Sequence, residues 1–370
     1  MKQTIVTLLI IISSLSIAQE PAKKVLMVVS SYGKDDGQTR PGYEFDELSQ
    51  AYLVFKANGL MVEIASPKGG DVEADQYNKE KQYNAIFLQD DAAMTALSNT
   101  LSTASLRSED YDALYVVGGK GAMFDLPFDP SLQDIILELY KRDDAILSAV
   151  CHGPAAFVNV KDGDRYIVEN EKLTSFSNEE ESLFGKKWVP EFPFMLETKL
   201  KERGAIHEPA PFMLSQVHTS GKFVTGQNPF STAQSAEAVV EALGLTPIAR
   251  ELYPDEKSIY SIQNLFNGTY SQKEFQKALK ANVDEYDVPL IAIYGYYTIN
   301  DEASDEKELL DGLSLIELTS PYFFNENLQL VAAKTYHKLD QDKKAKEILN
   351  ELIKKELAVE KAQALLLELN

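Results

Sequence analysis

The residues with the clearest capacity for chemistry lie in the segment Ala149-Val150-Cys151-His152-Gly153-Pro154-Ala155-Ala156, which holds the only cysteine of the 370-residue chain. An apolar run over residues 145–148 precedes it, and small residues flank the cysteine. This pattern is typical of a nucleophile elbow, a tight strand-to-helix turn that presents one side chain at the carboxyl end of a sheet. N–H groups at the start of that helix would favour the thiolate. We therefore predict that Cys151 is a reactive thiol, not a structural one.

A thiolate in such a turn can add to an aldehyde carbonyl. The hemithioacetal that forms must then lose a C–H proton and regain a proton at the neighbouring carbon. That exchange needs a second group that titrates near neutral pH, such as a histidine or a carboxyl shielded from water. His152, directly after the cysteine, is a candidate for this role.

The elements that must position these residues alternate between strand and helix. Apolar runs predict strands over residues 23–31, 60–65, 111–117, 145–150 and 223–225. Helical spacing of apolar residues predicts helices over residues 44–58 and 132–141. Alternation of this kind indicates an α/β fold with a mostly parallel sheet sandwiched by helices. The site of such a sheet lies outside the carboxyl ends of its strands, where Gly118, Gly119 and Cys151 fall.

The character of the chain changes between residues 243 and 254. Apolar periodicity predicts only helices beyond this point, over residues 258–266, 272–281, 290–299, 306–318, 326–339, 343–357 and 359–369. Residues 332–339 resemble the middle of a tetratricopeptide repeat, and residues 294–299 resemble a degenerate copy; an irregular helical cap is the alternative. We interpret residues 249–370 as a module for a homodimer or a protein partner. We expect it to be separable, near Leu245, from a catalytic domain spanning residues 19–248.

The N-terminus has the features of a secretory signal peptide. Lys2 provides a basic start, an apolar run covers residues 5–12, and Ser16-Ile17-Ala18 fits a cleavage site before Gln19. The apolar run is shorter than the roughly 20 residues of a membrane span. We therefore predict removal of residues 1–18, export to a periplasm or out of the cell, and no membrane attachment after cleavage. A single cysteine cannot form an internal disulfide, so Cys151 would remain a free thiol there.

Charge and histidine content exclude other classes of function. The formal net charge is −21, which disfavours a nucleic-acid partner and an anionic membrane surface. The remaining histidines, His207, His218 and His337, are scattered along the sequence. We interpret them as surface or packing residues and predict no metal site and no cofactor.

Four segments together resemble the ThiJ/PfpI superfamily, whose flavodoxin-like fold is related to class I glutamine amidotransferase domains. The resemblance covers about residues 23–245 and is greatest to the branch of glyoxalase III, also described as protein deglycase and heat-inducible chaperone. The four segments are Pro41-Gly42-Tyr43-Glu44-Phe45-Asp46-Glu47-Leu48, Gly118-Gly119-Lys120-Gly121-Ala122-Met123-Phe124-Asp125-Leu126-Pro127, residues 149–156, and Val224-Thr225-Gly226-Gln227-Asn228-Pro229.

The resemblance implies roles for individual residues. Cys151 matches the nucleophile of the family and His152 the histidine beside it. Glu47 matches the helix-borne glutamate whose carboxyl group contacts the thiol. The segment over residues 175–181 resembles the one that supplies an acidic partner to the histidine, with Glu181 favoured and Glu180 as the alternative.

The segment after the third apolar strand matches the family in one respect and departs from it in another. The resemblance implies an oxyanion hole made of the N–H groups near Gly119 and at His152. Lys120 stands where many relatives have histidine; a lysine there could hold an anion or point to solvent. The distal His-x-Glu pair of glutamine amidotransferases is absent, so transfer of ammonia from glutamine is not expected.

The function implied by the resemblance is that of a cofactor-independent glyoxalase. Such an enzyme converts small reactive carbonyl compounds, 2-oxoaldehydes such as methylglyoxal, to 2-hydroxy acids without glutathione. Two alternatives retain the same fold and thiol: a holdase or redox-sensing module that acts by binding, and a PfpI-like cysteine peptidase.

Overall fold

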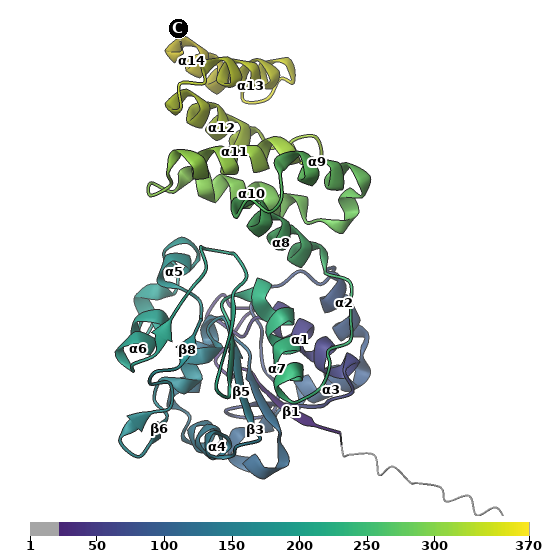
Figure 1. The fold of residues 1–370 in the computed structure, drawn as a ribbon, viewed down its shortest axis with the longest axis vertical. Helices are drawn as coiled ribbons and strands as arrows, with labels where there is room; N and C mark the ends of the chain where they lie inside the picture. Colours follow the sequence, from purple (N-terminus) through teal and green to yellow (C-terminus); the bar gives the residue numbers. More distant parts are fainter. Residues whose placement is uncertain (1–21, 370) are drawn as a thin grey trace, which may run out of the picture.

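The computed structural model describes residues 22–369, so the predicted signal peptide lies outside the described residues. Figure 1 shows an α/β domain with a stack of helices at one end, and the C-terminus at the far end of that stack. This is the predicted α/β class with an additional all-helical region.

The α/β domain is built on a seven-stranded sheet. Its strand order is β10-β11-β5-β4-β1-β2-β3, and only the edge pair β10–β11 is antiparallel. The central strands are apolar and fully buried, as expected for strands covered on both faces. The strands of this sheet are β1 Lys24–Val28, β2 Met61–Ser66, β3 Leu101–Ser102, β4 Ala113–Val116, β5 Ile146–Val150, β10 Val217–Ser220 and β11 Phe223–Gly226.

Helices cover both faces of the sheet and give it two apolar cores. One core contains side chains of α1 (Phe45–Ala57), α2 (Gln82–Gln89), α3 (Asp91–Ser98) and α7 (Thr232–Ala242). The other contains side chains of α4 (Pro130–Lys141) and α6 (Leu196–Glu202). Short excursions complete the domain: α5 Asn178–Phe184 and the strand pairs β6 Lys161–Asp162 with β7 Arg165–Tyr166 and β8 Lys172–Leu173 with β9 Ile206–His207.

The helical module comes after the α/β domain and matches the predicted helices closely. The helices α10 and α11 pack on each other, as do α12 and α13, so they form two successive hairpins. None of the helices within residues 22–369 combines the length and apolarity that a membrane crossing requires. The seven helices of the module are α8 Pro254–Phe266, α9 Gln272–Ala281, α10 Val288–Asn300, α11 Glu306–Thr319, α12 Glu326–Lys338, α13 Asp342–Lys354 and α14 Val359–Glu368.

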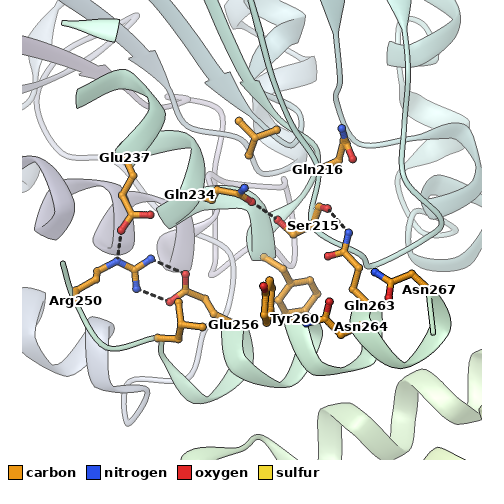
Figure 2. Close-up of a pocket in the computed structure, with 13 residues that line it drawn as sticks. Ser215, Gln216, Gln234, Glu237, Arg250, Glu256, Tyr260, Gln263, Asn264 and Asn267 are labelled. Carbon is orange, nitrogen blue, oxygen red and sulfur yellow. Dashed lines mark hydrogen bonds and ion pairs between the residues drawn. The ribbon is translucent and has the colours of Figure 1, made fainter. Parts of the chain in front are cut away.

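Ion pairs and apolar contacts hold α8 against the α/β domain. Figure 2 shows the Arg250 guanidinium between two carboxylates, with Glu237 of α7 at 2.8 Å and Glu256 of α8 at 2.7 Å. The carboxylate of Asp255 accepts a 2.6 Å hydrogen bond from the hydroxyl of Tyr83 in α2. A cavity of about 690 Å³ lies beside these contacts, lined largely by polar side chains.

The structure bears on the expectation that the module is separable, because the two parts share an apolar core. Phe212, Met213 and Leu214 of the α/β domain are buried in one cluster with side chains of α8, α9, α10 and α11. Removing the module would expose these three side chains to water.

Candidate active site

The turn after β5 has the geometry of a nucleophile elbow. Cys151 has a φ of +58°, in the left-handed region that non-glycine residues rarely adopt. Its N–H donates to the carbonyl oxygen of Gly226 at 2.9 Å, and its own carbonyl accepts from the N–H of Phe176 at 2.9 Å. These two bonds hold the strained backbone in place, so the side chain projects from the carboxyl end of the sheet.

The helix after the elbow differs from the prediction. Residues Gly153–Phe157 form a five-residue 3₁₀ helix instead of the expected α-helix. Pro154 and the tight packing of Ala155 and Ala156 fit this short turn. A helix of this length contributes little macrodipole, so the dipole part of the predicted stabilisation of a thiolate is small.

Cys151, His152 and Glu181 form a continuous chain of polar contacts. The Sγ atom of Cys151 lies 3.2 Å from Nδ1 of His152, and Nε2 of His152 lies 2.5 Å from Oε1 of Glu181. All three side chains are almost fully buried. A histidine held between a thiol and a carboxylate has its tautomer and orientation fixed, which suits it to move a proton to and from the sulfur.

The neighbouring carboxylate, Glu180, has a different role. It completes a capping box with Ser177 at the start of α5. It also accepts hydrogen bonds from the N–H of Met213 at 3.0 Å and from the amide of Asn228 at 2.8 Å. The structure therefore places Glu181, and not Glu180, against the histidine.

Gly185 gives Glu181 the room that this position requires. A Cβ atom built on Gly185 would lie 2.1 Å from Oε2 of Glu181. We expect Gly185→Ala to displace the carboxylate from His152 and to lower kcat by about tenfold or more. The melting temperature should also fall, because the added Cβ lies 2.7 Å from the backbone oxygen of Glu181 and 2.6 Å from Val189. Steady-state kinetics together with thermal unfolding would measure both effects.

Gly163→Ala is the control for the general cost of a Gly→Ala change: its φ of +62° makes the substitution strained, but its Cβ position is open and it does not line the Cys151 cavity, so kcat should stay unchanged. An unchanged kcat in Gly185→Ala would mean that the contact between His152 and Glu181 does not support turnover.

Glu47 lies beneath the thiol on α1 and is fully buried. Its Oε2 accepts a 2.7 Å hydrogen bond from the N–H of Gly118, which leaves Oε1 as the oxygen available to Cys151. Burial raises the pKa of the Glu47 carboxyl well above its usual range, and the charge of Glu44 raises it further. Contact with Cys151 acts in the opposite direction on the pKa of Glu47, although a protonated carboxyl can still donate its proton to sulfur.

The thiol is more protonated than the sequence pattern suggested. Burial raises the pKa of Cys151 well above its usual value, and the charge of Glu47 raises it further. The positive charge of Lys120 lowers the pKa of Cys151, which opposes these two effects. An ionised thiol next to an ionised Glu47 would place two negative charges in a buried site, so the two groups favour a state with one shared proton.

Gly119 and His152 both line the space in front of the thiol. Gly119 has a φ of +86° and lies directly against the backbone of Tyr43 and Glu44, where a Cβ would clash. Within residues 22–369, the N–H groups of Gly119 and His152 donate to no other protein group. Both are therefore available to a substrate oxygen, as an oxyanion hole requires.

A cavity of about 240 Å³ opens over Cys151 and His152, large enough for a small organic molecule. The larger cavity, between the α/β domain and α8, is lined by no cysteine and no histidine, so we place the site in the smaller one. Lys120 lines it and is half-buried, and its positive charge lowers the pKa of Cys151, Glu44 and Asp75. Other lining side chains include Phe176, Phe184, Met213, Asn228 and Phe230.

Two acidic residues in this cavity were not predicted as site residues. Glu44 and Asp75 line it beside Lys120. Burial raises the pKa of Glu44 to about 7, and the charges of Asp46 and Asp75 add to the effect. Glu44 belongs to the quoted segment 41–48, and its position three residues before Glu47 could have indicated a place on the same face of the helix.

We expect Glu44→Gln to shift the pH dependence of turnover. Glu44 is neutral below pH 7 and negative above it, and its charge helps Glu47 to keep a proton. Without that charge Glu47 loses its proton at lower pH, so the alkaline limb of kcat/KM should move to lower pH. A pH profile measures this shift.

Glu80→Gln removes an exposed carboxylate elsewhere in the α/β domain and should leave the profile unchanged. The same alkaline limb in Glu44→Gln and wild type would contradict the coupling between Glu44 and Glu47.

The other histidines lie away from the thiol. His207 is buried against the hydroxyl of Ser175 at 3.0 Å, and burial lowers its pKa to about 4. His218 contacts the carbonyl oxygen of Glu208, and His337 contacts Asp342. In the described part of the chain, no cluster of three or more His, Cys, Asp or Glu side chains is arranged to hold a metal ion.

Known proteins that are named glyoxalases are similar in sequence to about 60% of this chain. The chain is 33% identical over 242 residues to glutathione-independent glyoxalase hsp3102 of Schizosaccharomyces pombe, which covers 60% of this chain and 98% of the relative. It is 30% identical over 234 residues to glyoxalase 3 of Candida albicans, which covers 59% of this chain and 98% of the relative.

Solved structures are similar to the same share of this chain. The crystal structure of glyoxalase III from Candida albicans superposes with a TM-score of 0.55 at 27% identity, covering 60% of this chain and 97% of its own. Rapid Encystment Protein 24 KDa of Francisella tularensis superposes with a TM-score of 0.56 at 32% identity, covering 60% of this chain and 99% of its own. The profile of the DJ-1/PfpI family matches residues 38–242, which include Cys151, His152, Glu47 and Glu181. The chain therefore belongs to the DJ-1/PfpI family.

Proposed function

We propose that this protein is a cofactor-independent glyoxalase that converts 2-oxoaldehydes such as methylglyoxal to 2-hydroxy acids. The observation that carries the proposal is the arrangement around Cys151. Cys151 lines a small cavity together with Gly119, and its sulfur lies within contact of His152 and Glu47. Relatives at 30–33% identity that are named glyoxalases support it.

The reaction can be derived from these contacts. The Cys151 thiol passes its proton to Glu47 or His152 and its sulfur bonds to the aldehyde carbon, while the N–H groups of Gly119 and His152 stabilise the developing oxyanion. The other of these two groups then removes the C–H proton of the hemithioacetal and returns it to the neighbouring carbonyl carbon. The proton taken from the thiol ends on the oxygen of that carbon, which yields a thioester of the hydroxy acid. Water cleaves this thioester and releases lactate and the thiol.

The test is a substrate panel on the purified protein without glutathione. Methylglyoxal should yield lactate, measured by chromatography, and glycated and chromogenic peptides should be turned over more slowly. The proposal fails if lactate does not form above the rate of a protein-free control.

We further propose that the protein is exported after removal of residues 1–18. The basic, apolar and small-residue segments of the N-terminus support this proposal. Mass spectrometry of the protein from fractionated cells should find a mature N-terminus at Gln19 outside the cytoplasm. A full-length cytoplasmic protein would contradict export.

A second candidate function is protein binding by the helical module, as a homodimer contact or as a holdase. The tetratricopeptide-like interpretation is supported by the two successive hairpins, because the two predicted copies lie in α10 and α12, the first helix of each. Sedimentation would report a dimer. Suppression of client aggregation by Cys151→Ala as well as by wild type would favour the holdase.

A further inference from the structure

One wall of the Cys151 cavity also belongs to the interface with the helical module. Phe184, Met213 and Phe230 line the cavity. The same three side chains pack into the apolar cluster that contains residues of α8, α9, α10 and α11. Part of each side chain therefore faces the site and part faces the module.

Two tyrosines of α10 contact this wall or the residue beside it: Tyr297 contacts Phe184, and Tyr294 contacts Phe212, which precedes Met213. The ring of Tyr294 stacks on Phe212, with centroids 5.1 Å apart and an interplanar angle of 14°. The ring of Tyr297 meets Phe184 edge-on, with centroids 5.1 Å apart. Stacked and edge-on pairs of this kind add orientation to apolar packing.

The wall also carries backbone strain. Met213 has a φ of +60°, in the left-handed region that disfavours a residue with a side chain. Its N–H donates to Glu180, and the carbonyl of the next residue, Leu214, accepts from Asn228 at 2.8 Å. Such a conformation persists only where its surroundings hold it, and the helical module provides one side of those surroundings.

The module is an addition to the relatives compared above. Those relatives match about 60% of this chain while nearly their whole length is covered, so they have no counterpart of the module in the match. In the described residues, no side chain of the module lines the Cys151 cavity. Any effect of the module on the site must therefore pass through the shared wall.

We propose that the helical module sets the size selectivity of the Cys151 cavity by fixing Phe184 and the segment 212–214, with Tyr297 and Tyr294 as positioning residues. The module excludes bulky electrophiles by keeping the wall closed toward the thiol. The statement about substrates rests on the proposed glyoxalase function, whereas the statement about access to the thiol does not.

Alkylation of the full-length protein tests access without any assumption about function. Because Cys151 is the only cysteine, the rate of its alkylation can be followed by mass spectrometry. The two reagents are iodoacetamide and the bulkier iodoacetanilide, which have the same reactive group. We define the preference as the rate with iodoacetamide divided by the rate with iodoacetanilide, normalised to the same ratio for free cysteine. In Tyr297→Ala this preference should fall by at least about fivefold. Tyr297→Phe, which keeps the ring, should restore it.

Ile293→Ala is the matched control on the same helix, because Ile293 is 40% exposed. It should keep the wild-type preference. If Tyr297→Ala does not fold, Tyr297→Leu retains apolar volume without the ring and decides the question. The proposal is overturned if the preference is unchanged. This includes the case in which the alkylation rates with both reagents change by the same factor, which would indicate a general structural defect.

A second experiment compares methylglyoxal with the bulkier phenylglyoxal as substrates. The ratio of their kcat/KM values should shift toward phenylglyoxal in Tyr297→Ala and return in Tyr297→Phe. A wild-type protein that turns over neither compound would refute the proposed function, while the alkylation ratios would still decide the role of the module. Wild-type ratios in Tyr297→Ala would overturn the selectivity proposal alone.

Discussion

Cys151→Ala should form lactate from methylglyoxal at least about 10³-fold more slowly than the wild type, at the level of a protein-free control. The chain has no second cysteine that could replace it. His152 and Glu181 would remain in place, but they cannot form the covalent intermediate. The measurement is lactate production over time at saturating methylglyoxal.

The fold should survive this substitution. Removing one sulfur from a site with a φ of +58° leaves the turn to its two backbone hydrogen bonds, so the melting temperature should change by only a few degrees. Cys151→Ser is the informative companion, because it keeps the shape but replaces the thiol by a poorer nucleophile. Substantial lactate formation by either variant would remove the thiol from the mechanism.

Local sequence patterns predicted the frame of the site well. The apolar strand leading to Cys151 and the strand over residues 223–225 occur as β5 and β11, because fully buried parallel strands read as unbroken apolar runs. The bounds of the module helices were predicted to within a few residues. There, apolar periodicity coincides with capping boxes such as Ser271 with Glu274 and Asp305 with Glu308.

Other features depend on contacts between distant parts of the chain. The helices α2 and α3, with eight residues each, are too short for periodicity to identify. Burial of Cys151 and Glu47 opposes ionisation of the thiol, and no local motif reveals it. The stacking of Phe212 on Tyr294 joins two residues that are far apart in the chain, so no sequence pattern indicated that the module supports the site.

A protein ending at Leu245 should be poorly soluble, or soluble with an altered Cys151. Truncation there would expose Phe212, Met213 and Leu214, which are at most 8% exposed in the full chain. Burial of three such side chains contributes about 5–9 kcal/mol, a large part of the stability of a typical domain. It would also remove one of the two carboxylates that accept from the Tyr83 hydroxyl, that of Asp255, and leave Asp46. The soluble fraction and the rate of Cys151 alkylation are the measurements.

A longer protein that ends at Leu339 provides the control. It removes α13 and α14, whose apolar side chains belong to a different cluster from the one that contains Phe212. This protein should keep Cys151 as reactive and as selective as in the full chain, even if its own stability falls. A soluble protein ending at Leu245 with wild-type reactivity and selectivity would show that the α/β domain builds its site alone. The wall of the Cys151 cavity would then not depend on α8 and α10.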